Sequence, residues 1–196
     1  MKSRLVDYFR KIDALSADEA TAIERSMVVR TYDKGTVLLE AGQISTSAYF
    51  VLEGCLRQYS LRDGEEHTTA FFTESQWVIS LASSLRQAPA EHSVVCAETT
   101  TVVIGNAQRE AALFERYPRL QSVARRVVEH LLAEEQSRLA AYVAASPEER
   151  YLALRQERPE LLERLPLYQI ASYVGIRPES LSRIRKRLSQ SARPRT

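Results

Sequence analysis

The sequence predicts an α+β protein with three parts: an antiparallel β-roll of the jelly-roll type with flanking helices, one long helix, and a pair of short helices joined by a tight turn. Three observations support this fold class. Short runs of β-branched and aromatic residues recur at roughly ten-residue intervals between residues 31 and 105. Residues 119–145 contain neither glycine nor proline. Near the C-terminus, Gly175 separates two short segments whose apolar residues have helical spacing.

Residues 3–30 have the periodicity of helices. Apolar side chains recur at helical spacing from Leu5 to Leu15. Ser16 followed by Glu19 has the pattern of a capping box, in which side chains and backbone cap each other at a helix start. We therefore expect two short helices before the sheet.

Residues 31–105 are expected to form the β-roll. Strand-like runs occupy residues 36–40, 47–52, 56–61, 68–72, 93–97 and 100–104. The pair Asp63 and Gly64 lies between two of these runs and is a strong signal for a two-residue hairpin. Turn signals at this spacing indicate an antiparallel sandwich or barrel.

The helical period returns after Asn106, and residues 119–145 predict a helix on the order of 40 Å long. The 4-3-4 spacing of a coiled-coil seam is followed by Leu120, Ala124, Val127 and Leu131. Such a helix can be buried within one subunit or form a dimer interface. Its length relative to the small domains on either side favours the dimer. Ser146 and Pro147 begin a further helix. We therefore divide the chain into residues 1–116, 117–145 and 146–196.

The last helix carries the most informative chemistry. Pro178 suits its first turn, where a missing N–H costs nothing. At 100° per residue one side carries Leu181, Ile184 and Leu188, which must face a core. The opposite side carries Glu179, Arg183, Lys186 and Gln190. A carboxylate, two cations and an amide on one exposed face can contact base edges in a DNA major groove, although a solvated basic helix end would carry similar charges.

Charge and composition limit the other functions. The formal net charge is +2, yet seven Lys or Arg and one acid follow from Arg177 onward, which favours a single anion-facing surface. No apolar stretch is long enough to cross a bilayer and no signal-peptide core is evident, so we expect a cytoplasmic protein without membrane contact. Glycine-rich phosphate loops and nucleophile–base sets are missing, so an enzyme is not expected.

The cysteines and histidines give no support for a metal or haem site. Cys55 and Cys96 are far apart and lie within apolar runs, which favours buried structural thiols over a disulfide or a redox sensor. The three histidines are scattered. We therefore predict no cofactor.

This order of parts resembles the Crp/Fnr family of bacterial transcription regulators. Residues 34–42 and 48–54 are similar to the family's β-roll pattern, and residues 170–184 are similar to its DNA-binding helix-turn-helix. The resemblance implies a β-roll like a cyclic nucleotide-binding domain, a homodimer formed through the long helix, double-stranded DNA with an inverted-repeat operator as partner, and contact with RNA polymerase. The family's base-contacting positions fall on Glu179 and Arg183. The predicted DNA-binding residues are Arg177, Glu179, Ser180, Arg183, Lys186 and Arg187.

The sequence departs from the family where cyclic nucleotides bind. No glycine occurs between Gly64 and Gly105, and the phosphate-binding arginine position falls at or near Glu91, whose carboxylate would repel a phosphate. We therefore expect no cyclic nucleotide and leave the effector unknown. The residues assigned to the candidate effector pocket are Gln76, Trp77, Glu91 and His92. Trp77 could stack on a planar ligand or simply pack in the core.

A second departure lies at the C-terminus, where the family's β-hairpin wing is expected to be reduced or missing. Arg193 and Arg195 can replace its phosphate contacts as a flexible arm, or contribute nothing. One alternative function stays open: a ligand-sensing β-roll protein that acts through protein contacts and has a degenerate DNA-binding end. The intact polar face of the last helix argues against that alternative.

Overall fold

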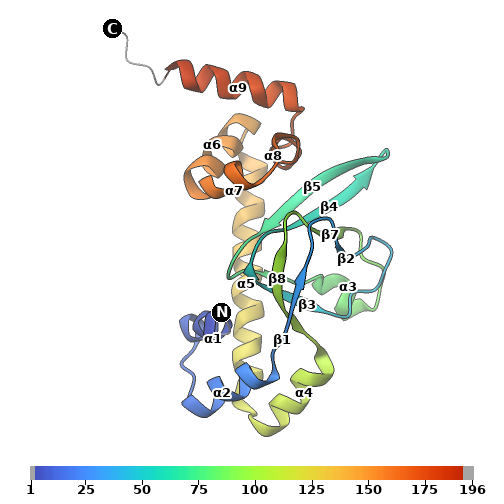
Figure 1. The fold of residues 1–196 in the computed structure, drawn as a ribbon, viewed down its shortest axis with the longest axis vertical. Coiled ribbons are helices and arrows are strands. Elements are labelled where there is room, and N and C mark those ends of the chain that lie inside the picture. The colour runs from blue at the N-terminus through green and yellow to red at the C-terminus, as the bar shows by residue number, and fades with distance from the viewer. Residues whose placement is uncertain (1–2, 192–196) are drawn as a thin grey trace.

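The computed structural model describes residues 3–191, and Figure 1 shows a long central helix that runs along a β-roll from one end of the molecule to the C-terminal helices. The helices are α1 (Ser3–Ile12), α2 (Ala17–Ser26), α3 (Leu81–Arg86), α4 (Ala107–Arg116), α5 (Arg119–Ala144), α6 (Pro147–Glu157), α7 (Pro159–Arg164), α8 (Leu167–Val174) and α9 (Pro178–Ser191). The strands are β1 (Val28–Tyr32), β2 (Val37–Leu39), β3 (Ala48–Glu53), β4 (Leu56–Arg62), β5 (Glu65–Phe72), β6 (Trp77–Val78), β7 (Ser93–Cys96) and β8 (Thr100–Gly105). Helices α2 and α4 lie at one end and α9 lies at the other.

The strands form two four-stranded antiparallel sheets, ordered β1-β8-β3-β6 and β2-β7-β4-β5. This confirms the antiparallel β-roll that the sequence predicts. The expected hairpin joins β4 to β5, and its two central residues, Asp63 and Gly64, have φ angles of +53° and +80°. Positive φ at both positions is what a two-residue turn between twisted strands requires.

Four elements were not foreseen: strands β1 and β6 and the short helices α3 and α7. Strand β1 occupies residues 28–32, where the sequence predicts helix as far as residue 30, and it pairs antiparallel with β8 from Val28 opposite Ile104 to Tyr32 opposite Thr100. The helical prediction is wrong there because cross-strand pairing decides the conformation of a short β-branched segment. Strand β6 and helix α3 are too short to produce a recognisable period.

The roll has an apolar interior and a second apolar layer outside it. The interior is packed with buried side chains from both sheets, among them Val51, Leu56 and Val94. On the outer face of the first sheet, Phe50 and Leu52 pack with residues of α1, α2 and α5. The predicted capping box at the start of α2 is confirmed, since Glu19 N–H donates to Ser16 Oγ (3.1 Å) and Ser16 N–H donates to Glu19 Oε2 (2.8 Å).

Helix α5 confirms the long helix, and two of the four residues of its predicted seam are buried within the chain. Leu120 and Val127 are 3% and 4% exposed and face the hydrophobic layer of their own chain, so they do not present an open surface. Ala124 and Leu131 are half-buried. The apolar side chains that α5 leaves exposed lie further along it: Leu132, Leu139, Tyr142 and Val143. The 4-3-4 pattern cannot tell a helix face that packs within one chain from a face that packs on a second chain, so the interface assignment of these four residues stays a prediction.

Residues 147–191, which we name the C-terminal unit, share a core with the roll. Its largest buried side chains include Leu161, Ile170 and Leu181, and the same hydrophobic cluster contains Cys55, Phe71 and Ala97 of the roll. Helix α8 packs along β5, where Thr68 N–H donates to Ser172 Oγ (2.9 Å) and the rings of Phe71 and Tyr173 are 5.3 Å apart. None of the helices in the described part of the chain is long and apolar enough to span a membrane.

Candidate functional site

The turn between α8 and α9 depends on a glycine. Gly175 has a φ of +82°, and its N–H donates to the carbonyl groups that end α8. A Cβ at this position would lie 3.1 Å from Arg150 Nη1 and 3.2 Å from Tyr142 Oη. Glycine therefore satisfies both a left-handed backbone and a crowded site, and it directs the chain into α9 at a fixed angle.

One side of α9 anchors the helix. Leu181 is completely buried, and Ile184 and Leu188 pack half-buried against the same cluster. These are the three residues that helical periodicity assigns to the core. Burial of a leucine side chain stabilises its attachment by about 1.5–3 kcal/mol. The opposite face of α9 is thereby held toward solvent.

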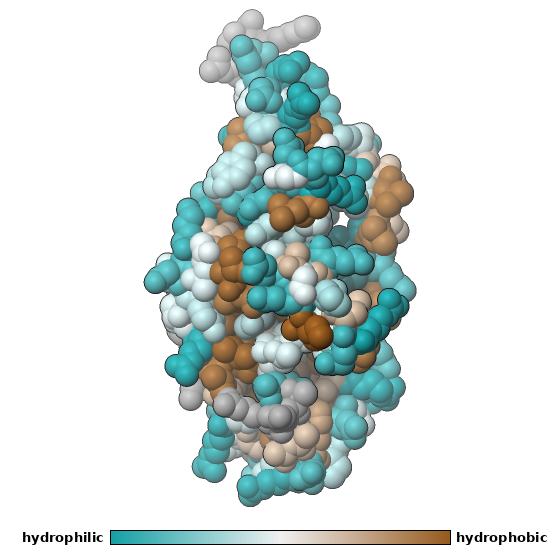
Figure 2. Space-filling model, turned by 90° about the vertical axis from the view of Figure 1, so that its right-hand side faces the viewer, coloured by the Kyte–Doolittle hydropathy of each residue, from teal (hydrophilic) through white to brown (hydrophobic). Residues whose placement is uncertain are grey.

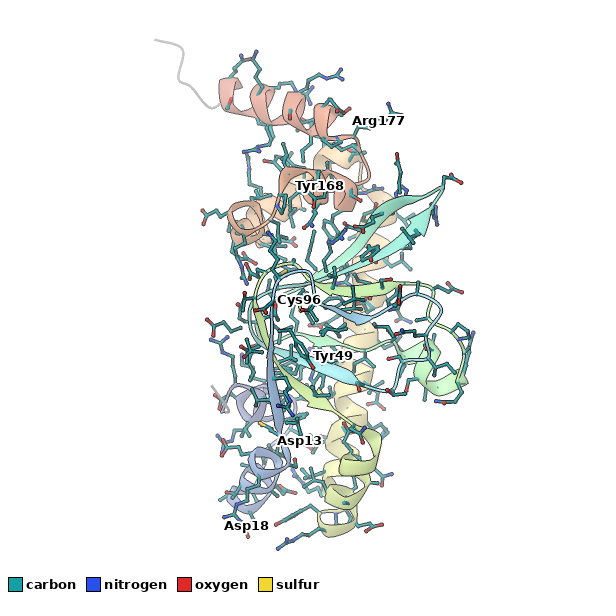
Figure 3. The ribbon with its side chains drawn as sticks, turned by 45° about the vertical axis from the view of Figure 1, so that its right-hand side comes forward. Asp13, Asp18, Tyr49, Cys96, Tyr168 and Arg177 are labelled. Carbon is teal, nitrogen blue, oxygen red and sulfur yellow. The ribbon has the colours of Figure 1, made fainter. Side chains whose placement is uncertain are left out.

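The exposed face of α9 carries the predicted DNA-binding side chains. Arg177, Glu179, Arg183 and Lys186 are exposed, and Ser180 is half-buried. Within residues 3–191, the side chains of Arg177, Arg183 and Lys186 make no ion pair or hydrogen bond. Figure 2 shows a largely hydrophilic surface at this end of the molecule, and Figure 3 places Arg177 at the end opposite to Asp18 of α2.

Arg187 differs from its neighbours because it forms an ion pair with Glu148 of α6. Both side chains are substantially exposed, so the pair contributes little to stability. The pair nevertheless turns the guanidinium toward α6 and away from the centre of the exposed face. Arg193 and Arg195 lie outside the described residues.

The structure separates the four residues of the candidate effector pocket into two pairs. Gln76 and Trp77 line a groove of about 700 Å³ between α5, the turn before β6 and the C-terminal unit. Trp77 also lines an apolar cavity of about 290 Å³ beneath α1, α4 and α5. Its ring packs near Phe50 (5.2 Å) and Phe9 (6.4 Å), which is core packing, and its Nε1 has no hydrogen-bond partner. Glu91 and His92 border neither space.

Glu91 and His92 lie on the loop that leads from α3 to β7. The Glu91 carboxylate is exposed, and His92 Nε2 is 2.6 Å from Ser80 Oγ. Burial lowers the pKa of His92, and the neighbouring Glu91 carboxylate opposes this effect only in part. The imidazole is therefore neutral at neutral pH. Residues 87–96 contain no lysine or arginine, so this loop presents no permanent cation to an anionic ligand.

The two cysteines are buried and free, as the sequence predicts. Burial raises the pKa of Cys55 to about 12 and that of Cys96 to about 11. Both thiols are therefore protonated and unreactive at neutral pH.

Sequence reasoning missed the arginines that join the C-terminal unit to the roll. Arg158 donates to the carbonyl oxygen of Phe71 (3.0 Å) and to Thr73 Oγ1 (2.9 Å), and Arg164 forms ion pairs with Glu74 and Glu98. These partners are separated by more than sixty positions in sequence. No local pattern distinguishes the two arginines from solvated surface cations, so only the tertiary structure could reveal them.

Comparison with known proteins identifies the fold of the roll. Residues 29–117 match the family model of the cyclic nucleotide-binding domain. No curated protein sequence matches the chain.

Several solved structures share the arrangement of nearly the whole chain. The global regulator CLP of Xanthomonas campestris, described as c-di-GMP responsive, superposes with a TM-score of 0.66 at 15% identity over 92% of this chain and 96% of that chain. A CooA mutant from Carboxydothermus hydrogenoformans gives a TM-score of 0.62 at 13% identity, covering 85% and 78%. The catabolite activator protein of Thermus thermophilus gives 0.55 at 20% identity, covering 94% and 87%. At these identities the likeness establishes a common fold.

Proposed function

We propose that the chain is a homodimeric, sequence-specific DNA-binding transcriptional regulator of the Crp/Fnr type. The observation that carries this proposal is the exposed face of α9, where unpaired cations surround Glu179 on a helix whose other side is anchored by Leu181. In this proposal residues 1–116 form the sensor domain, residues 117–145 the dimerisation helix, and residues 146–196 the DNA-binding domain, with RNA polymerase as a further partner in the cytoplasm. The shared fold with CLP and the catabolite activator protein supports the same assignment.

Each DNA-binding residue has a role in this proposal. Arg183 donates two parallel hydrogen bonds to a guanine, and Glu179 accepts from a cytosine amine or orients Arg183. Arg177, Lys186 and Arg187 contact phosphates, which position the helix without reading sequence. Ser180 lies on the flank of the helix and contributes a hydroxyl to the backbone contact. To contact a phosphate, Arg187 must leave its ion pair with Glu148. This exchange of one exposed ion pair for another costs little.

The exposed apolar side chains of α5 support the dimer. Leu132, Leu139 and Val143 are 53%, 64% and 73% exposed and share one face at helical spacing. A second copy of α5 would remove this apolar face from water and place two copies of α9 on one side of the dimer. Two such helices related by a dyad require half-sites about 34 Å apart, one turn of duplex.

Selection of binding sites from random duplex DNA tests this proposal. The expected product is an inverted repeat whose half-site centres lie one helical turn, about 10 base pairs, apart. Recovery of unrelated sequences from both the wild-type chain and the Arg183→Ala variant would overturn it.

We further propose that the β-roll does not bind cyclic AMP or cyclic GMP. Glu91 and neutral His92 offer no cation to the phosphate, and the roll interior is packed with apolar side chains. Calorimetry at millimolar nucleotide should therefore give no binding heat. A micromolar dissociation constant for either nucleotide would refute this part of the proposal.

A further inference from the structure

We propose that Arg158 and Arg164 clamp the C-terminal unit to the turn at residues 73–76 and act as positioning residues for DNA binding. The clamp fixes the direction in which α9 faces relative to the roll. This inference rests on the proposed function, and the experiments below include one measurement that does not depend on DNA.

Arg164, at the end of α7, bridges two carboxylates of the roll. Its Nη1 and Nη2 atoms lie 3.1 Å from Glu74 Oε2 and Oε1, and its Nε lies 3.1 Å from Glu98 Oε1. The guanidinium thereby joins the turn before β6 to the turn before β8. The three side chains are 24%, 31% and 29% exposed, so solvent screens them less than a surface pair.

Arg158, between α6 and α7, reaches the same turn from the other side. Its Nη1 donates to Phe71 O, and its Nη2 donates to Thr73 Oγ1 and to Gln76 Oε1 (3.2 Å). Gln76 Oε1 also accepts from Thr73 N–H (2.8 Å). Arg158 therefore contacts the first and last residues of the four-residue turn, and Arg164 contacts its second residue, Glu74.

The turn is connected to the interior of the roll. Ser75 N–H donates to Val51 O (2.9 Å) and Val51 N–H donates to Gln76 O (3.0 Å), which ties the turn to β3. Ser75 has a φ of +67°, a left-handed conformation that a residue with a side chain adopts at some cost. The next residues form β6, and Val78 is buried in the roll interior. A change in that interior would therefore displace the groups that Arg158 and Arg164 contact.

The docked unit leaves the cationic face of α9 exposed. The contact therefore does not mask the proposed DNA-binding surface. Instead, it restricts the orientations of two α9 helices in a dimer, and preorganisation of this kind raises affinity for the half-site spacing that matches it. Loss of the clamp should make the protein more tolerant of wrong spacings.

Thiol labelling tests the clamp without DNA. Cys55 lies in the cluster that the roll shares with the C-terminal unit, whereas Cys96 lies in the roll interior. In a Cys96→Ala background, Arg164→Gln or Arg158→Gln should accelerate labelling of Cys55 on the order of fivefold to tenfold. Labelling of Cys96 in a Cys55→Ala background should stay unchanged. Arg155→Gln is the matched control, because it changes an exposed arginine of α6 that has no partner within residues 3–191.

Glu98→Gln removes one of the two carboxylate charges that face Arg164, so it weakens the contact from the roll side and serves as the second test if an arginine variant fails to fold. Unchanged Cys55 labelling in all three variants would overturn the clamp. An equal acceleration at Cys55 and Cys96 would also overturn it, because that result reports general destabilisation.

Binding to inverted repeats of varied half-site spacing tests the positioning role. The clamp variants should lose preference for the best spacing by about fivefold, while Arg155→Gln retains it. Tighter binding of the clamp variants at the best spacing would mark the contact as inhibitory and contradict the proposal. If the wild-type chain binds no DNA at all, the proposed function fails, whereas the labelling result still decides whether the clamp exists.

Discussion

The β-roll closes its core with its own two sheets, whereas the C-terminal unit completes its core with Cys55, Phe71 and Ala97 of the roll. The core of the roll is a cluster of apolar side chains, whereas the contact with the C-terminal unit combines an apolar cluster with the arginine contacts of Arg158 and Arg164. The hydrophobic attraction between apolar side chains is non-directional, while hydrogen-bonded arginines specify one geometry. The comparison indicates that the roll is built for stability and the contact for orientation.

Truncation of Phe71, which the roll contributes to the core of the C-terminal unit, should show this difference most strongly. Phe71 and Phe50 are both buried, but Phe71 packs with Tyr173 of the C-terminal unit and Phe50 packs under α1. Replacement of either by alanine should lower the free energy of unfolding by about 3–5 kcal/mol in urea titrations. Phe71→Ala alone should accelerate Cys55 labelling before global unfolding. Equal labelling of the two variants would mean that the C-terminal unit has no opening of its own.

The two halves of α5 extend the comparison to the dimer. Leu120 is buried in its own chain and Leu139 is exposed. Leu139→Glu should place paired charges between the two exposed apolar faces of α5 and weaken dimerisation by roughly thirtyfold or more without unfolding the monomer. Leu120→Glu should instead unfold the chain. Sedimentation velocity with circular dichroism separates the two effects, and an unchanged dimer for Leu139→Glu would remove this face from the interface.

Two glycines with similar φ angles distinguish the cost of a left-handed backbone from the cost of steric crowding. Gly175 and Gly64 have φ angles of +82° and +80°, but only Gly175 would bring a Cβ near other atoms. Gly64→Ala should cost about 1–2 kcal/mol, the cost of a left-handed residue. Gly175→Ala should cost more because Arg150 and Tyr142 must move. Equal losses in thermal unfolding would show that this turn is not crowded.

Acidification should slightly weaken the contact between the C-terminal unit and the roll. Burial raises the pKa of Glu74, but hydrogen bonds from Arg164 and from Gly54 N–H outweigh it and leave the pKa below its ordinary value of 4.5. Arg164 and Glu98 are the charged groups that face it. Its contribution is therefore complete above about pH 4.5 and is lost as the pH falls through the lowered value. Hydrogen exchange in α8 should rise over this range, and Glu74→Gln should abolish that pH dependence.

Local patterns predicted the roll, its hairpin, the capping box at Ser16 and the buried side of α9, because each depends on residues close in sequence. Strand β1 was missed because its conformation is decided by pairing with β8. The sequence pattern of the seam could not show that Leu120 and Val127 are buried within their own chain, because that burial depends on residues remote in sequence. Arg158 and Arg164 gave no signal, since their partners are remote in sequence. The DNA-binding residues and the effector pocket stay predictions.

A binding series with Arg183→Ala tests the central claim most directly. The variant is compared with Arg25→Ala, which removes the same charge from an exposed arginine on α2 at the opposite end of the molecule. Both are titrated against the selected operator and its single-base variants. We expect Arg183→Ala to lose about 1–3 kcal/mol on the operator and to stop discriminating at one base pair of each half-site. Equal weakening on every sequence, or behaviour identical to Arg25→Ala, would contradict base reading by α9.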